Sequence, residues 1–195
     1  MAPKALLFDL DGTIWNSYPF YSACLAASGG GSAAAAEKKL RCGESVVNLC
    51  RSLRIPDARF CSLCAKNASS AMLFPGVYDT LAVIKRRKNA IGVVTSLPGR
   101  LANPILNALS LDTTFDVVIH AGNCRYRKPS PGPITAALSV MNIAPCSAFY
   151  VGDTDSDARA AAAAHTGFAW ASYGYGTTCP PDAVPLRTFK DVLEL

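Results

Sequence analysis

The chain has 195 residues, of which 50% are hydrophobic and 17% are charged. This length and composition suit one domain, or one domain with a modest insertion, and exclude a disordered chain. The formal net charge of +5 would help to attract an anionic ligand, but it falls short of the concentrated basic face of a nucleic-acid-binding protein. We therefore expect no nucleic-acid partner. No apolar run approaches the roughly 20 residues of a membrane-spanning helix, so we also expect no membrane partner.

The first residues and the cysteines indicate a cellular compartment. Residues 1–4 lead into only a short apolar run before Asp9, so we expect no secretory signal. A chain this long and rich in core residues does not depend on disulfides, and its eight cysteines are expected to pack as small hydrophobic side chains with reduced thiols. Cys61 and Cys64 have a zinc-like spacing, but no second such pair accompanies them. These features predict a cytoplasmic protein.

Short apolar runs alternate with segments of helical length along most of the chain. The runs lack a strict polar alternation, as expected of parallel strands that are covered on both faces. The expected strands are residues 5–8, 91–94, 117–119, 148–151 and 167–170. The expected helices between and after them are residues 77–88, 100–109, 131–142 and 155–165. This alternation predicts a Rossmann-like, doubly wound parallel α/β fold.

One connection interrupts this alternation. About sixty residues separate the first expected strand from Pro75-Gly76, and they contain no convincing strand. A structureless loop of that length would be unusual, so we expect a small all-helical insert. Its candidate helices are residues 18–27, 33–40, 44–53 and 57–71. The predicted organisation is therefore an α/β core of residues 1–16 and 75–195, with a helical domain of residues 17–74 inserted after the first strand.

Two acidic clusters follow expected strands. Asp9 and Asp11 are two residues apart just after the first strand, and Gly12 lets the chain turn sharply there. Asp153 and Asp157 follow the fourth strand. Ligands of open parallel sheets bind at the carboxyl ends of the strands, and hard carboxylate oxygens gathered at such an edge suit Mg²⁺. Each cluster alone could be a solvated turn or a helix start.

Thr95 and Lys128 add a hydroxyl and a cation on the same side of the expected sheet. Taken singly, a strand-end threonine usually satisfies nearby backbone groups, and a loop lysine is usually solvated. Together with the two acidic clusters, in this order along the chain, they argue for one functional site. The segment 173–176 fits either a loop near that site or a simple turn.

These motifs resemble those of the haloacid dehalogenase-like hydrolase superfamily, and the resemblance covers nearly the whole chain. Phe74-Pro75-Gly76-Val77 resembles the re-entry of that family into its core domain. The helical insert is similar to the C1 cap of the phosphoglycolate phosphatase-like branch, and Arg41-Cys42-Gly43-Glu44-Ser45 looks like its cap specificity loop. The core motifs that carry the resemblance are Asp9-Leu10-Asp11-Gly12-Thr13, Thr95, Lys128-Pro129, and Gly152-Asp153 followed by Asp157.

The resemblance implies a role for each of these residues. Asp9 would be the nucleophile that forms an aspartyl-phosphate, and Asp11 would be the general acid and then the general base. Mg²⁺ would be held by Asp9, the backbone carbonyl of Asp11 and Asp153, with Asp157 ordering its water shell.

The phosphoryl oxygens would be bound by Thr95, Ser96 and Lys128. In the insert, Arg41 and Ser45 would contribute to substrate specificity. Ser96 stands where this branch often has Asn, and Trp15-Asn16-Ser17 replaces a commonly acidic stretch.

The expected function is that of a Mg²⁺-dependent phosphatase acting on a small phosphorylated metabolite, with phosphoglycolate and sugar phosphates as candidates. The dehalogenases of the superfamily lack an acid two residues after the nucleophile, so the presence of Asp11 favours phosphate-ester chemistry. Two alternatives stay open: a phosphomutase of the same superfamily, and a non-catalytic module that binds a phosphorylated ligand with a metal.

Overall fold

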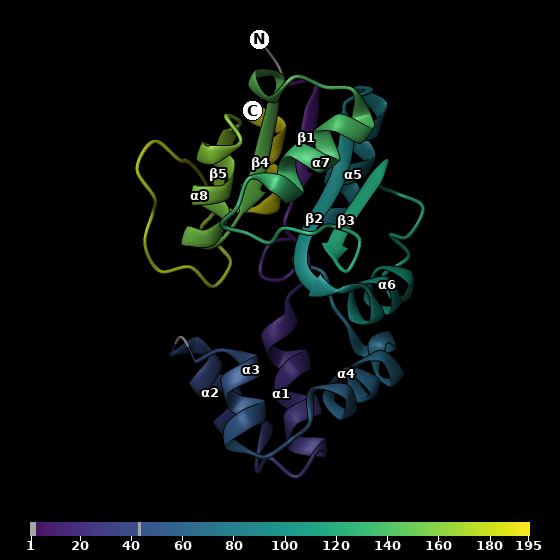
Figure 1. Ribbon diagram of the computed structural model, residues 1–195, viewed down its shortest axis with the longest axis vertical. Coiled ribbons are helices and arrows are strands. Elements are labelled where there is room, and N and C mark those ends of the chain that lie inside the picture. Colours follow the sequence, from purple (N-terminus) through teal and green to yellow (C-terminus); the bar gives the residue numbers. More distant parts are fainter. Residues whose placement is uncertain (1–2, 43) are drawn as a thin grey trace.

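A computed structural model describes residues 3–42 and 44–195 and contains a six-stranded, fully parallel sheet (Figure 1). The strand order is β3-β2-β1-β4-β5-β6. The strands are β1 (Ala5–Phe8), β2 (Ala90–Pro98), β3 (Val117–Ala121), β4 (Ala148–Gly152), β5 (Gly167–Ala171) and β6 (Val184–Leu186). The five expected strands and the parallel α/β architecture are confirmed. The short edge strand β6 was not expected, because three residues containing a proline carry almost no strand signal.

Both faces of the sheet are covered, which explains why its strands lack polar alternation. Along β1, Leu6 and Phe8 belong to one hydrophobic cluster, whereas Ala5 and Leu7 belong to another on the opposite face. The first face packs against α5 (Val77–Arg86), α6 (Gly99–Ala108) and the C-terminal 3-10 helix η3 (Phe189–Glu194). The second packs against α7 (Gly132–Met141) and α8 (Asp155–Ala163). The ends of α5, α6, α7 and α8 lie within two residues of the expected ones, and η3 was not expected; a 3-10 turn η2 (Pro145–Ser147) precedes β4.

The expected all-helical insert is confirmed between β1 and α5. It contains α1 (Ser17–Ala27), α2 (Ala33–Arg41), α3 (Val46–Ser52), α4 (Asp57–Lys66) and the 3-10 turn η1 (Ala68–Ser70). We call α1–α4 the cap. Ser32 and Ser45 set the starts of α2 and α3, because their hydroxyls accept hydrogen bonds from the backbone N–H groups of Ala35 and Asn48. The domain limits of 17 and 74 stay a prediction.

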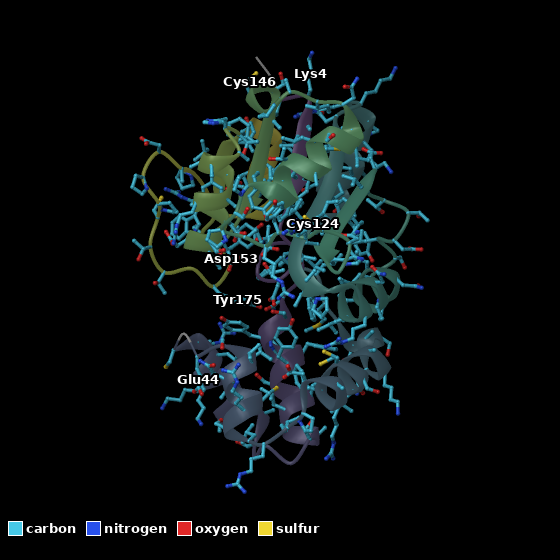
Figure 2. The ribbon with its side chains drawn as sticks, viewed as in Figure 1. Lys4, Glu44, Cys124, Cys146, Asp153 and Tyr175 are labelled. Carbon is cyan, nitrogen blue, oxygen red and sulfur yellow. The ribbon has the colours of Figure 1, made fainter. Side chains whose placement is uncertain are left out.

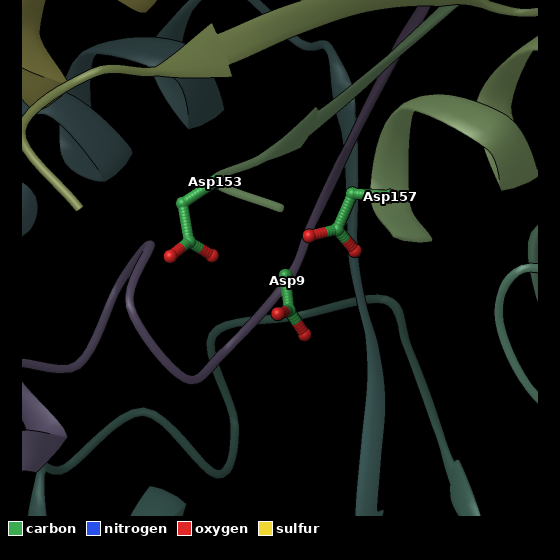
Figure 3. Close-up of side chains that lie close together, drawn as sticks. All are labelled: Asp9, Asp153 and Asp157. Atoms are coloured by element: carbon green, nitrogen blue, oxygen red, sulfur yellow. The ribbon is translucent and has the colours of Figure 1, made fainter. Parts of the chain in front are cut away.

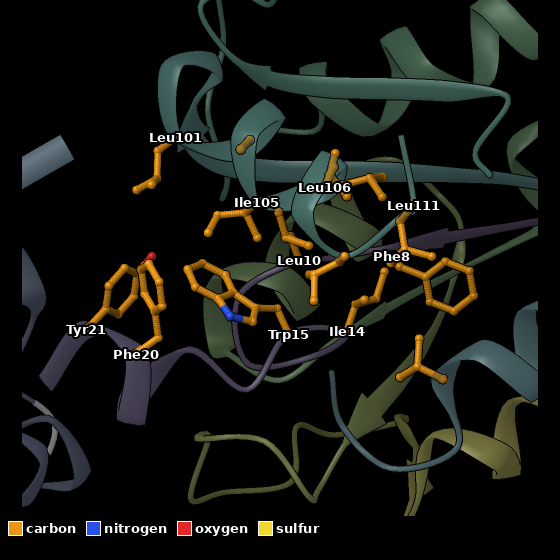
Figure 4. Close-up of a cluster of buried hydrophobic side chains, with 14 of the residues drawn as sticks. Phe8, Leu10, Ile14, Trp15, Phe20, Tyr21, Leu101, Ile105, Leu106 and Leu111 are labelled. Carbon is orange, nitrogen blue, oxygen red and sulfur yellow. The ribbon is translucent and has the colours of Figure 1, made fainter. Parts of the chain in front are cut away.

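The cap lies beyond the carboxyl ends of the strands, and the arrowheads of β2 and β3 point toward the cap (Figure 1). Trp15, fully buried, anchors the junction, and its ring meets Phe20 and Tyr21 edge-on at 5.2 Å (Figure 4). The same cluster contains Leu101 and Ile105 of α6, so the cap and the core share one hydrophobic core. No helix in the described parts of the chain is long and apolar enough to cross a bilayer.

Candidate active site

The turn after β1 carries the first two acidic residues. Asp9 follows β1 directly, and its backbone N–H donates to the carbonyl of Val151 in β4 at 2.8 Å. Gly12 has a φ of +79°, and a Cβ there would lie 2.8 Å from the carboxyl carbon of Asp153. Only glycine therefore suits this position, for its dihedral angle and for the space that it leaves. The turn thus brings the Asp9 loop against the loop that follows β4.

The loop after β4 supplies two more carboxylates. Asp153 comes at the end of the strand, and Asp157 is the third residue of α8, where it forms a capping box with Thr154. The Thr154 N–H and hydroxyl donate to Asp157 Oδ2 at 3.0 and 2.6 Å. This reciprocal capping fixes the Asp157 side chain at a helix start while its other oxygen faces the site.

Asp9, Asp153 and Asp157 converge on one point, each with an oxygen within 4.8 Å of the others (Figure 3). All three are buried. Burial, reinforced by the charge of Asp157, raises the pKa of Asp153 to about 7. Burial also raises the pKa of Asp9 well above its usual value, although Lys128 opposes the shift. Three buried carboxylates at this spacing fit a hard divalent cation, which would relieve their mutual repulsion.

Lys128 provides the positive charge at the other side of the cluster. Its Nζ lies 2.8 Å from Asp9 Oδ1 and 2.6 Å from Asp157 Oδ1, and its side chain is only 5% exposed. It also donates to the hydroxyl of Tyr150 at 2.9 Å, which in turn donates to the carbonyl of Val94. Burial acts to lower the pKa of Lys128, but the carboxylates of Asp157 and Asp9 outweigh it and raise that pKa, so the ammonium stays charged.

Asp11 lies apart from the three clustered carboxylates. Its side chain accepts hydrogen bonds from the hydroxyls of Ser17 and Tyr21, both on α1 of the cap, the second at 3.1 Å. Burial raises the pKa of Asp11, and these two hydrogen bonds only partly oppose the shift. A carboxyl group that faces the cap and holds a proton more readily than usual suits a general acid.

A cavity of about 710 Å³ extends between the core and the cap, and of the predicted site residues of the core only Asp157 is absent from its described lining. Asp9, Asp11, Asp153, Lys128 and the two predicted phosphate-binding residues, Thr95 and Ser96, all line it. Thr95 is buried and its hydroxyl accepts from the N–H of Leu97, whereas Ser96 is exposed. A larger hollow of about 900 Å³ lies near residues 3–4 and 192–195, remote from these carboxylates.

The two cap residues predicted for specificity lie differently. Ser45 lines the cavity, although its hydroxyl is engaged in capping α3. Arg41 is absent from the described lining, and its guanidinium is 2.6 Å from Glu37 on the exposed side of α2. Gly43, in the middle of the predicted specificity loop, lies outside the described residues.

Tyrosines that were not anticipated complete the site. Tyr175 belongs to the segment 173–176, for which the sequence left open a loop near the site or a simple turn. Its N–H donates to Asp153 Oδ2 at 2.9 Å and its hydroxyl to Asn16 at 3.0 Å. Its ring stacks on Tyr18 at 3.5 Å, and Figure 2 places it between Asp153 and the cap. The loop after β5 therefore ties an acidic residue of the core to the start of α1.

Comparison with known proteins identifies the class that this fold and site define. Residues 6–171 match the family model for haloacid dehalogenase-like hydrolases, so the chain belongs to that family. It is 31% identical over 192 residues to a phosphoglycolate phosphatase of Nitrosococcus oceani, covering 89% of this chain and 85% of the relative. It is 29% identical to phosphoglycolate phosphatase 1 of Pseudomonas aeruginosa, covering 89% and 71%.

A crystal structure from Lactobacillus plantarum, assigned as a phosphoglycolate phosphatase, superposes with a TM-score of 0.80 and 27% identity, covering 100% of this chain and 99% of that one. The chain is thus a phosphatase of the haloacid dehalogenase-like family, on the branch similar to phosphoglycolate phosphatases. The resemblance, the fold and the enzyme class predicted from the sequence are confirmed.

The raised pKa of Asp153 has a measurable consequence for the metal-free protein. Between the ordinary value of 3.8 and about 7, the folded chain holds a proton that the unfolded chain has lost. The free energy of unfolding should therefore fall as pH rises through this interval, by roughly 3 kcal/mol. Urea unfolding in EDTA at pH 4.5 and 7.5 measures the change.

Asp153→Asn is the matched variant, because the amide does not titrate. The variant should lack this part of the pH dependence, and Mg²⁺ at pH 7.5 should stabilise the wild type more than the variant. Superimposable pH profiles of the two proteins would contradict the assignment.

Proposed function

We propose that this phosphatase hydrolyses small phosphate monoesters by a Mg²⁺-dependent mechanism with a phosphorylated Asp9 as the intermediate. The observation that carries the proposal is the position of Asp9, held between the Lys128 ammonium at 2.8 Å and the carboxylates of Asp153 and Asp157. In this position Asp9 can attack an anionic phosphoryl group, and the neighbouring Lys128 can neutralise the charge of that group.

In the first step, a carboxylate oxygen of Asp9 attacks phosphorus while the ester oxygen departs. Asp11 gives its proton to that oxygen, which leaves as an alcohol. The raised pKa of Asp11 supports this role, because the protonated form persists nearer to neutral pH. Thr95, Ser96 and Lys128 hold the phosphoryl oxygens, Lys128 supplying the compensating charge.

In the second step, a water molecule attacks the phosphorus of the phosphorylated Asp9. Asp11, now a carboxylate, accepts a proton from that water. The bond between phosphorus and the Asp9 oxygen breaks, inorganic phosphate departs, and Asp9 regains its free carboxylate.

Mg²⁺ would be held by Asp9 and Asp153 with the backbone carbonyl of Asp11. When bound, it supplies positive charge between the nucleophile and the phosphate. Asp157 contributes differently, since its two oxygens accept hydrogen bonds from Lys128 and from Thr154. We assign Asp157 to fixing the position of Lys128 and to ordering the water around the cation.

A small phosphorylated metabolite in the cytoplasm is the partner that fits this chemistry. All eight cysteines are free thiols, three of them exposed, in keeping with a reducing compartment.

The test is phosphate release from p-nitrophenyl phosphate and from ethyl phosphate, with Mg²⁺ and with EDTA, for the wild type and Asp11→Asn. We expect Mg²⁺-dependent release that needs no bisphosphate activator. Asp11→Asn should lower turnover of ethyl phosphate by about 10²–10⁴, and that of p-nitrophenyl phosphate much less, because nitrophenolate needs no proton to leave.

Equal losses for the two esters would remove Asp11 from the role of acid. Release that requires a sugar bisphosphate would indicate a phosphomutase. Mg²⁺-dependent binding of phosphate without any turnover would indicate a binding module.

A further inference from the structure

The leaving group of the substrate extends toward the cap. Asp11, the proposed acid, holds its carboxyl group against Ser17 and Tyr21 at the start of α1. The ester oxygen that receives the proton must come within hydrogen-bonding reach of that carboxyl group. Whatever is attached to this oxygen therefore enters the part of the cavity that the cap helps to line.

The walls of that part are aromatic and aliphatic. The rings of Tyr21 and Phe60 are 6.0 Å apart, and both residues are at most 5% exposed. An apolar group placed against such a wall is stabilised by the loss of its surface from water. The apolar lining also includes Tyr18, Leu40, Val46 and Val47 of the cap, and Leu97 and Leu101 of the core.

The charges on the cap side disfavour an anionic leaving group. Among the described residues that line the cavity, the cap contributes two acids, Glu44 and Asp57, and neither a lysine nor an arginine. The lining cations besides Lys128 are Arg100 and Arg127, both exposed on the core. A carboxylate carried into the cap would lose hydration next to apolar groups and like charges.

The size of the cavity points the same way. Its volume of about 710 Å³ lies within the range of about 300–1,000 Å³ of pockets that enclose drug-sized ligands. A two-carbon hydroxy acid would leave most of the apolar wall in contact with water, whereas a longer hydrocarbon would cover it.

We propose that the site selects phosphate monoesters of extended apolar alcohols, alkyl or aryl, over esters of short hydroxy acids. This inference rests on the proposed phosphatase function, because it assigns the substrate class of the same site. It departs from the substrate named for the relatives, which is phosphoglycolate.

The first experiment compares kcat/KM for the n-alkyl phosphates from ethyl to hexyl with that for 2-phosphoglycolate, all in Mg²⁺. The alkyl alcohols are nearly equal as leaving groups, so the series isolates contact with the wall. We expect kcat/KM to rise by up to about fourfold for each methylene group that becomes buried, with phosphoglycolate below hexyl phosphate.

A matched pair of variants tests the wall itself. Val47, on α3, lines the cavity and is 50% exposed, so Val47→Asp should fold. Val140, on α7 and 67% exposed, lies outside the cavity lining. Val47→Asp should lower kcat/KM for hexyl phosphate about tenfold and that for ethyl phosphate by a smaller factor, whereas Val140→Asp should change neither.

A flat alkyl series would overturn the inference. So would a higher kcat/KM for phosphoglycolate than for hexyl phosphate, and loss of that preference in Arg100→Ala would assign the selectivity to a core cation. If no monoester is turned over, the proposed function fails, and calorimetric binding of hexylphosphonate and ethylphosphonate then decides separately. Tighter binding of hexylphosphonate supports the apolar site, and equal binding contradicts it.

Discussion

Asp9→Asn is expected to lower the turnover of every phosphate monoester by a factor on the order of 10⁴–10⁶, the usual effect of removing a nucleophile. The amide is nearly isosteric with the carboxylate but is a poor nucleophile toward phosphorus. The substitution also removes one of three buried carboxylates, the one whose pKa is raised by burial and by the charges of Asp157 and Asp153. The fold should therefore survive, and melting of the variant in EDTA should occur at or near the wild-type temperature.

Acid quenching of a single turnover with ³²P-labelled p-nitrophenyl phosphate gives a second readout. The wild type should retain label on the protein, and Asp9→Asn should not. Asp112→Asn is the matched control, because Asp112 is exposed and does not line the cavity. Turnover of Asp9→Asn within tenfold of the wild type, with the fold intact, would exclude Asp9 as the nucleophile.

The core of the site could be predicted because its residues follow strands. In a parallel sheet the ends of β1, β2 and β4 meet at one edge, so the order of motifs in the chain fixes their neighbourhood in space. Asp9 and Asp153 follow directly from this rule, whereas Thr95 lies inside β2, in the part that continues past its pairing with β1. Lys128 comes from a loop after β3, and only its position among the other motifs indicated that it turns inward.

The tyrosines could not be predicted in the same way. Tyr150 lies inside β4 and matches the pattern of a buried strand residue, so nothing in the sequence marks its hydroxyl as a partner of Lys128. Tyr21 belongs to a helix whose residues are apolar on most sides, where hydrophobic periodicity selects no face. Tyr175 reaches Tyr18 across more than 150 residues of chain, a contact that only the folded cap and core create.

The cap side of the cavity also depends on tertiary structure. Arg41 and Ser45 were singled out by the resemblance of one loop, but neighbouring helices determine which side chains face the site. Arg41 instead pairs with Glu37, one turn earlier on the exposed side of α2, and is absent from the described cavity lining. The cap side of the apolar wall is built from α1, α2, α3 and α4 together, and no single stretch of sequence carries its pattern.

Lys128→Met is expected to lower the free energy of unfolding by about 3–5 kcal/mol in EDTA and to remove nearly all turnover. The methionine fills a similar volume but leaves Asp9 and Asp157 buried without their cation. An uncompensated buried charge costs more than the ion pair contributes. The lost stability therefore reports mainly the cost of leaving the two carboxylates buried without a cation. Chemical denaturation at pH 7.5 measures it, with Lys190→Met, at an exposed position, as the control.

The double variant Lys128→Met with Asp157→Asn separates the structural role of Lys128 from its catalytic role. Asparagine keeps an acceptor for Thr154 at the start of α8 while removing the stranded charge. Part of the lost stability should return, so the two substitutions should be strongly non-additive. Turnover should not return, because the double variant still lacks the ammonium group that compensates the charge of the phosphoryl oxygens beside Asp9. Additive losses of stability would mean that the pair is not coupled, and recovered turnover would mean that Lys128 supports the fold without acting on the phosphate.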